Sequence, residues 1–129
     1  MTGGNVVLCL RATLRLIRLC TVPFTLGFLD KGALATHHQR HRGRFGWISE
    51  DRYADRADKF LGFPLDPVRQ LERKRSNGET VRGETVRYDQ VTNEFGVLSG
   101  DGHILTYFKP DVRTHGKASN LEYFKDCSK

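Results

Sequence analysis

Apolar and polar residues alternate along the second half of the chain in short runs that predict antiparallel strands. Residues 95–98 and 104–108 each place side chains on alternating faces, and Arg87-Tyr88 closes an earlier run of the same kind. Residues 99–102 read Ser-Gly-Asp-Gly, which predicts a tight turn because glycine reaches positive φ at little cost. Pro110 has no N–H, so we expect the last strand to end before it.

A helical pattern precedes these strands, at residues 49–62. Ser49 is a preferred helix N-cap, and Gly62 favours the end of the helix. Apolar side chains recur at intervals of three and four residues, which predicts one buried stripe along the helix. This stripe comprises Tyr53, Ala57, Phe60 and Leu61.

A short duplication lies between the helix and the later strands. Residues 76–78 read Ser-Asn-Gly and predict a hairpin turn. The pentapeptide Gly-Glu-Thr-Val-Arg then occurs twice in succession, at 78–82 and 83–87. Five is an odd number, so an inserted copy exchanges the inward and outward positions of a strand unless the backbone absorbs it. We expect either a bulge at Gly83 or a longer hairpin loop.

Together these patterns predict an α+β fold. Residues 68–75 are expected to form the first strand, with Val68 and Leu71 facing inward, and Asn120 is expected to cap a short final helix. The predicted architecture has N-terminal helices packed on a four-stranded antiparallel β-meander, followed by the short C-terminal helix. One face of the sheet packs on the helices, and the other face is expected to be open to a partner.

The first 35 residues differ from the rest of the chain. Residues 6–29 are mostly apolar, but Arg11, Arg15 and Arg18 interrupt them at helical spacing. Three arginines within about 20 residues disfavour a membrane span, and they also argue against a secretory signal peptide. We expect a basic apolar leader over 1–35, outside the core, and one folded domain over 36–129.

Composition adds a preference for polyanions. The chain has 129 residues, a net charge of +6 and a pI near 9.5. A basic balance of this kind favours a partner such as nucleic acid. The three cysteines, Cys9, Cys20 and Cys127, form no Cys-x-x-Cys pair, so neither a disulfide framework nor a zinc knuckle is implied.

Residues 37–46, His-His-Gln-Arg-His-Arg-Gly-Arg-Phe-Gly, hold the densest group of imidazole and basic side chains. If this segment is helical, His37 and His41 share one face, four residues apart. Zinc binding would need a third ligand such as His103 or His115. The alternatives are a solvated basic loop, or acid–base chemistry on a ribose 2′-hydroxyl, because histidine titrates near neutral pH.

The last predicted strand ends with two groups that suit phosphate chemistry. Thr106 offers a hydroxyl and Lys109 a fixed cation, and both lie close to the end of the sheet. The ordinary interpretation is that Thr106 is a β-former and Lys109 a surface charge.

Several motifs resemble one toxin family. The chain carries H-x3-H-x3-F-G, an S-x3-Y-x3-A-x2-F-L helix, N-G-E-T-V-R-Y-D, T-N-E-F-G-V, D-G-x-I-x-T-Y-F-K-P and N-L-E-Y-F. Over residues 37–124 it resembles the C-terminal tRNase toxin domain of CdiA-type contact-dependent inhibition proteins, in the barnase/EndoU/colicin/RelE-like group of nucleases. The resemblance implies an α+β fold, a metal-independent endoribonuclease without a cofactor that cleaves tRNA or other RNA, and a cognate immunity protein as partner.

The resemblance also implies a place of action and a set of departures. A domain of this family is delivered into the cytoplasm of a target cell, whereas an orphan module would stay in the cytoplasm of its own cell, and stable membrane insertion is not expected. Arg42 and His38 stand where the family usually has a glycine and an aromatic residue. The duplicated pentapeptide is also outside the family pattern. The alternatives are a non-catalytic RNA- or protein-binding module, or a decayed toxin fragment.

The site implied by the resemblance combines acid–base and phosphate-binding groups. His41 would act as acid or base with His37 assisting, and the T-x-F-K motif would contribute the hydroxyl and the cation to the phosphate. Cationic and aromatic neighbours would bind the RNA. The expected catalytic residues are His41, His37, Thr106 and Lys109, and the expected RNA- or phosphate-binding residues are Arg87, Tyr88 and Arg113.

Overall fold

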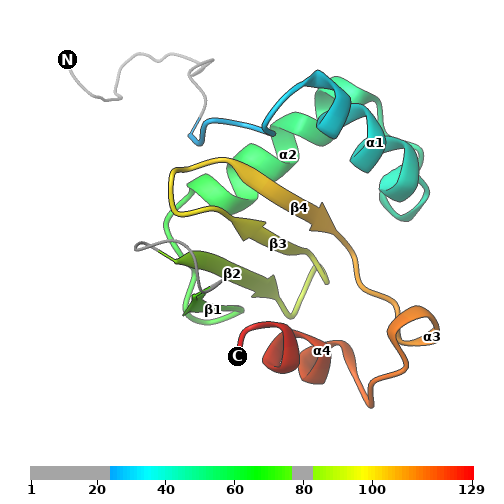
Figure 1. Ribbon diagram of the computed structural model, residues 1–129. Coiled ribbons are helices and arrows are strands. Elements are labelled where there is room, and N and C mark those ends of the chain that lie inside the picture. The colour runs from blue at the N-terminus through cyan, green and yellow to red at the C-terminus, as the bar shows by residue number, and fades with distance from the viewer. Residues whose placement is uncertain (1–23, 77–82) are drawn as a thin grey trace.

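The computed structural model describes residues 24–76 and 83–129. A four-stranded antiparallel meander in the order β1-β2-β3-β4 lies between two groups of helices (Figure 1). This arrangement confirms the predicted α+β fold. The elements in chain order are α1 (Lys31–His41), the 3-10 helix η1 (Arg42–Phe45), α2 (Glu50–Gly62), β1 (Gln70–Arg75), β2 (Glu84–Asp89), β3 (Phe95–Leu98), β4 (Ile104–Phe108), α3 (Val112–His115) and α4 (Asn120–Cys127).

Helix α2 packs one face of the sheet as its pattern predicts. The Ser49 side chain accepts a hydrogen bond from the backbone N–H of Arg52, which caps the helix. Gly96 on β3 lets the helix approach closely, because a Cβ at that position would lie 3.1 Å from the side chain of Leu61. The predicted stripe of Tyr53, Ala57, Phe60 and Leu61 is buried in a cluster that also contains Phe45, Ile104 and Tyr107.

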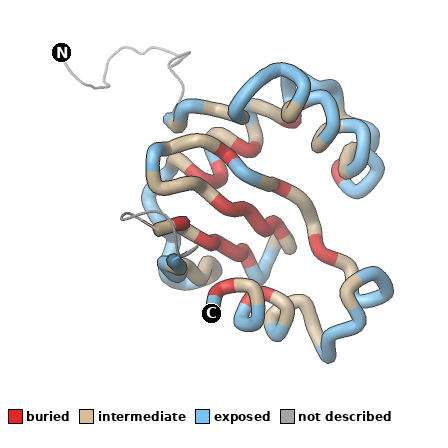
Figure 2. The backbone as a smooth tube through the Cα atoms, viewed as in Figure 1, coloured by how far each residue is buried: buried red, intermediate tan, exposed pale blue. Residues whose placement is uncertain are grey.

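The opposite face of the sheet is also covered, which corrects the expectation that it is open. Phe124 on α4 is 1% exposed and packs in a cluster on this face. Figure 2 shows the buried colour along β2 and β3. Helix α4 is capped by Ser119, whose side chain accepts from Glu122 N, and not by Asn120 as predicted. Phe124 shares its cluster with Val86, Tyr88, Phe95 and Val97.

Strand β1 begins two residues later than predicted. Val68 was expected to face inward, but it is 89% exposed. The reason is a turn around Asp66, whose carboxylate accepts from Val68 N and whose carbonyl accepts from Gln70 N. Leu71 does pack on the second cluster, so only the inward position at Val68 was wrong.

The duplication is absorbed without a bulge in the paired strands. The β1–β2 register runs without interruption from the pair Gln70–Asp89 to the pair Arg75–Glu84. Gly83 lies immediately before this ladder with φ 74°, and a Cβ there would come within 2.8 Å of the carbonyl oxygen of Arg75. The first copy of the pentapeptide, with most of the predicted hairpin turn, lies outside the described residues.

The predicted boundary at residue 35 is wrong for the last part of the expected leader. Phe24 N and Thr25 N donate to the carboxylate of Asp58 on α2, and Phe28 forms a parallel bridge with Ile104 on β4. Helix α1 itself starts at Lys31, where Asp30 accepts from Ala33 N. Residues 24–35 therefore belong to the folded domain, while residues 1–23, with Cys9 and Cys20, lie outside the described residues. In the described ranges, no helix has the length and apolar character needed to cross a membrane.

Candidate active site

Helix α1 places its two spaced histidines beside the edge strand β4. The rings of His37 and His41 stack with centroids 6.0 Å apart, so the four-residue spacing does put them on one face. The His41 ring stacks in turn on Phe108, with centroids 5.0 Å apart, and the His37 ring packs against Phe28 at 5.4 Å. Both imidazoles are half-buried between α1 and the strand.

The hydrogen bonds made by the ring nitrogens distinguish His37 and His41 from the other three histidines. His38 Nε2 lies 2.7 Å from the carbonyl oxygen of Ile48, and His103 Nδ1 lies 3.2 Å from the carboxylate of Asp101. His115 is held at both nitrogens, by Asn120 Oδ1 and by Lys117 N. In residues 24–76 and 83–129, neither nitrogen of His41 has a hydrogen-bond partner, and His37 Nδ1 is buried and unpaired. The ring nitrogens of His41 are thus available to exchange a proton with a bound molecule, whereas Nδ1 of His37 is buried.

The surroundings hold both imidazoles in the neutral form. Burial, which is the largest cause, acts together with the charges of His37 and Arg40 to lower the pKa of His41 to about 4. Burial, together with Arg40, also lowers the pKa of His37. At neutral pH each ring can therefore accept a proton.

Thr106 and Lys109 lie near the pair but on different sides of β4. Thr106 is opposite Val97 and shares its sheet face with Phe108, the residue that stacks on His41. Lys109 instead places its ammonium 5.1 Å from the centre of the Phe45 ring, on the side of the first cluster. The structure therefore places Thr106 on the same face of β4 as Phe108. It places Lys109 on the other side, beyond the end of the strand.

Arg44 is a neighbour that sequence reasoning missed. Its guanidinium donates from Nη2 to the carbonyl oxygen of Pro110 and from Nε to that of Lys109. These bonds fix η1 on the end of β4, where Nη1 of Arg44 also lies 3.7 Å from the carboxylate of Asp111. Phe108 was also missed, although its alternation with Thr106 placed both on one face of the predicted strand.

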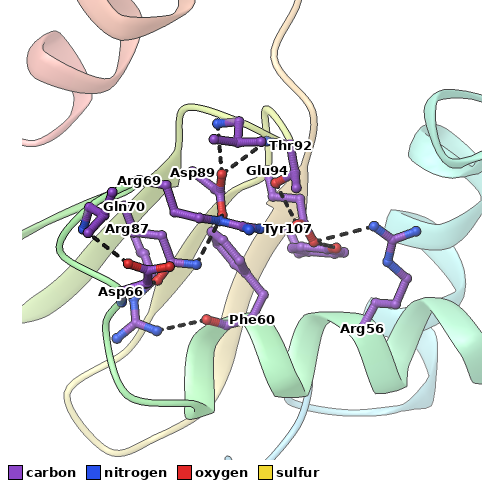
Figure 3. A network of polar contacts seen from close by, with 12 residues as sticks. Arg56, Phe60, Asp66, Arg69, Gln70, Arg87, Asp89, Thr92, Glu94 and Tyr107 are labelled. Atoms are coloured by element: carbon purple, nitrogen blue, oxygen red, sulfur yellow. Dashed lines mark hydrogen bonds and ion pairs between the residues drawn. The ribbon is translucent and has the colours of Figure 1, made fainter.

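Arg87 and Tyr88 do not belong to this site, which corrects their predicted role in RNA binding. Arg87 is 6% exposed and points into the protein, where Nη1 donates to the carbonyl oxygens of Phe60 and Phe63 at the end of α2 (Figure 3). Its Nε donates to Glu72 at 2.8 Å. Tyr88 is buried on the opposite face and donates its hydroxyl to Asn93 Oδ1. Both side chains hold the fold together.

Arg113 lies apart from the histidine pair, on α3. Its guanidinium is largely exposed and forms two contacts with the carboxylate of Asp111, from Nε at 3.2 Å and from Nη2 at 2.9 Å. Exposed pairs of this kind are worth little, so Arg113 can leave Asp111 for a phosphate. It remains a candidate for peripheral RNA contact only.

A second group of polar side chains, separate from the histidine pair, has a structural role. Asp89 is fully buried, and burial opposes its ionisation, but hydrogen bonds from Thr92 N, Arg69, Gln70 and Val91 N outweigh this effect and lower its pKa to about 2 (Figure 3). Beside it, the Tyr107 hydroxyl donates to Glu94, which also faces Arg56 at 3.6 Å. Val91 and Thr92 are local partners of Asp89 in a turn, whereas Arg69, Gln70 and the Tyr107–Glu94 pair come together only in the folded chain.

The described residues offer no third ligand for zinc beside the histidine pair. His103 and His115, the two candidates, bond to Asp101 and Asn120 as described above. In residues 24–76 and 83–129, no three histidine, cysteine or carboxylate side chains gather closely enough to hold a metal ion.

The lowered pKa of His41 predicts a pH-dependent stability. Between about 6.5, the ordinary pKa of the imidazole, and about 4, the unfolded chain binds a proton at this position and the folded protein does not. The free energy of unfolding should therefore decrease as the pH falls through this range. Urea unfolding at several pH values measures the slope, and His41→Gln should make it shallower. An unchanged slope in that variant would contradict the lowered pKa.

No protein-family model and no curated protein matches the chain. The function of the histidine pair must therefore be argued from its own geometry: two neutral imidazoles with free ring nitrogens, a hydroxyl on the adjacent strand, and the cations of η1 and of the end of β4.

Proposed function

We propose that this protein is a metal-independent endoribonuclease that cleaves tRNA or other RNA through the substrate's own 2′-hydroxyl. The observation that carries the proposal is the His37–His41 pair, stacked beside β4 with neutral rings and unpaired nitrogens. A neutral imidazole is the group that such a reaction needs as its base. The resemblance to CdiA-type tRNase toxins points to the same pair.

In the proposed reaction His41 takes the proton from the 2′-hydroxyl, and the 2′-oxygen attacks the adjacent phosphorus. The bond from phosphorus to the 5′-oxygen breaks as the new bond forms. The protonated His41 then gives its proton to the departing 5′-oxygen, so no proton is consumed overall. The products are a 2′,3′-cyclic phosphate and a free 5′-hydroxyl. His37, stacked at 6.0 Å, holds the His41 ring in position.

Negative charge develops on the phosphate oxygens during this step, and two neighbouring groups are suited to stabilise it. The Thr106 hydroxyl shares its face of β4 with Phe108, the residue on which the His41 ring stacks. To bind a phosphate, the Lys109 ammonium would give up its cation–π contact with the Phe45 ring. Such a contact contributes about 0.5–1 kcal/mol at exposed sites. A negatively charged, non-bridging phosphate oxygen is a far better partner for the ammonium, because hydrogen bonds between charged groups are the strong ones.

The biological setting proposed with this activity is that of a toxin domain used in bacterial competition. It would act in the cytoplasm of a target cell and be blocked by a cognate immunity protein. The net charge of +6 suits RNA as the substrate. The same charge also favours a second candidate, a module that binds RNA without cleaving it.

Incubation of the purified protein with total tRNA in EDTA tests the proposal on a denaturing gel. We expect discrete fragments that end in 2′,3′-cyclic phosphate. An oligonucleotide with a 2′-deoxyribose at the cleaved linkage should stay intact, because it lacks the nucleophile. Intact tRNA at every protein concentration would overturn the nuclease proposal, and salt-dependent binding of that tRNA would favour the binding module.

The pH dependence of cleavage provides a separate prediction. The acid limb of kcat/KM reports the free enzyme's base, which is His41 in this mechanism. Because burial lowers the pKa of His41 to about 4, activity should persist well below the ordinary imidazole value of 6.5. Initial rates at low substrate concentration, measured from pH 4 to pH 8, locate the limb. A limb near 6.5 would assign the base to a more exposed histidine.

A further inference from the structure

Trp47 has a conformation and an exposure that its role in the fold does not explain. It is the single tryptophan of the chain. Its φ of 61° lies in the left-handed region, which bulky side chains rarely adopt, and it directly follows Gly46 at φ 71°. The residue is nevertheless 72% exposed. A large aromatic side chain held in an unfavourable backbone conformation and turned to solvent points to a binding role.

The ring of Trp47 has two neighbours that support it. The guanidinium of Arg42 lies over it, 5.2 Å from the ring centre. A Cβ at Gly43 would lie 3.7 Å from the nearest ring atom, so the backbone passes close beneath the indole. These contacts fix the orientation of the ring and leave the rest of its surface free for a flat partner.

An open pocket of about 700 Å³ adjoins the indole, between the η1–α2 connection and the exposed side of α2. Arg52 and Arg56 reach it from α2, and Arg56 also lies over the Phe45 ring at 5.2 Å. Among the described residues that line the pocket, Asp55 is the only carboxylate, and Lys59 pairs with it at 2.9 Å. The pocket therefore combines an aromatic wall with excess positive charge.

We propose that this pocket binds an unpaired base of single-stranded RNA, with the base stacked on Trp47 and the adjoining phosphate held by Arg52. Aromatic stacking together with cations along the backbone is how proteins bind unpaired nucleotides. The charge favours RNA over a protein partner, since a protein surface that matched this pocket would have to be acidic. The inference rests on the proposed function for the identity of the ligand, and it adds a preference for unpaired substrate.

The pocket wall is tied to α1 and to the end of β4. The carbonyl oxygen of Ile48, in the wall, lies 2.7 Å from the ring of His38, which stands next to His37 on α1. Phe45 lies in the same wall, and the ammonium of Lys109 lies 5.1 Å from the centre of its ring.

The fluorescence of Trp47 tests the proposal directly, because no other tryptophan contributes. The probe is a single-stranded hexanucleotide with 2′-O-methyl groups, which cannot be cleaved through its 2′-oxygens. We expect saturable quenching by this probe and much weaker quenching by a blunt duplex of the same sequence. Arg52→Ala should weaken binding about fivefold or more. The control Arg73→Ala, an exposed arginine on β1 at the opposite edge of the sheet, should change it less than twofold.

A second variant distinguishes the effect of the indole ring on binding from the effect of the strained backbone. Trp47→Gly removes the indole and relieves the left-handed strain, so the protein should remain folded. Binding of a fluorescein-labelled probe, followed by anisotropy, should weaken about tenfold, within the range for loss of one stacked base. Unchanged affinity in Trp47→Gly, or no quenching of the wild type, overturns the base-binding proposal. Cleavage of tRNA is a separate readout, so failure of the nuclease proposal would be seen as intact tRNA with quenching retained.

Discussion

Replacement of His41 by alanine should reduce tRNA cleavage by about 100- to 10,000-fold, which is the usual contribution of a positioned acid–base group. Within the described residues neither ring nitrogen of His41 has a hydrogen-bond partner, and its ring stacks at 5.0 Å on Phe108, which shares a face of β4 with Thr106. Initial rates on tRNA in EDTA, compared at equal protein concentration, measure the loss.

The matched control is His103→Ala. His103 lies on the turn between β3 and β4, and its Nδ1 is engaged with Asp101, so its loss should leave cleavage within about twofold. Both variants should unfold cooperatively in urea, with His41→Ala destabilised by about 1 kcal/mol for the lost contact with Phe108. Full activity in a folded His41→Ala protein would remove this residue from the mechanism. Equal losses in both variants would indicate an effect on the fold.

Arg87→Ala should destabilise the protein by about 3–5 kcal/mol, the cost of breaking a buried and hydrogen-bonded ion pair. The guanidinium is 6% exposed and donates to Glu72 and to two carbonyl oxygens at the end of α2. Its removal leaves these acceptors buried without a donor. A small domain has about 5–15 kcal/mol of stability in total, so the midpoint of urea denaturation should shift strongly.

Arg113→Ala is the corresponding control among the arginines first assigned to RNA. Its side chain is exposed and paired only with Asp111, so its loss should change stability by about 0.5 kcal/mol or less. If Arg87→Ala instead kept the stability of the wild type and selectively lost affinity for RNA, the assignment of Arg87 to the fold would be wrong.

Local patterns predicted those elements whose side-chain spacing repeats within one segment. The stripe on α2 and its cap at Ser49 depend on neighbours within a few residues, and both are present. The expected alternation along 104–108 is interrupted, because the pairing of β3 with β4 shifts register after Val97 and both Ile104 and Tyr107 are buried in the first cluster. The spacing of His37 and His41 likewise placed the two rings on one face of a helix. The period of a helix or a strand fixes the directions of its side chains relative to one another, because these directions depend only on the backbone geometry of that segment.

The errors share a different origin. Val68 was assigned to the first strand but lies in a turn that the side chain of Asp66 organises. Helix α4 is capped by Ser119 and buries Phe124 against the sheet. Arg87 was expected to close a strand as a surface cation, but it lies inside β2, with the end of α2 over it. Each outcome depends on a segment that is distant along the chain.

The sequence by itself therefore determined the α+β class, the meander, the helix at 50–62 and the pairing of two histidines on one helical face. Only the tertiary structure decided what that face contacts, which cations are free, and which are buried as ion pairs. It also placed Trp47 over Gly43 and beside a pocket, with nothing in the local pattern to indicate it. The reason is that periodicity orients a side chain within its own element, whereas burial, pKa and access depend on which other element packs against it.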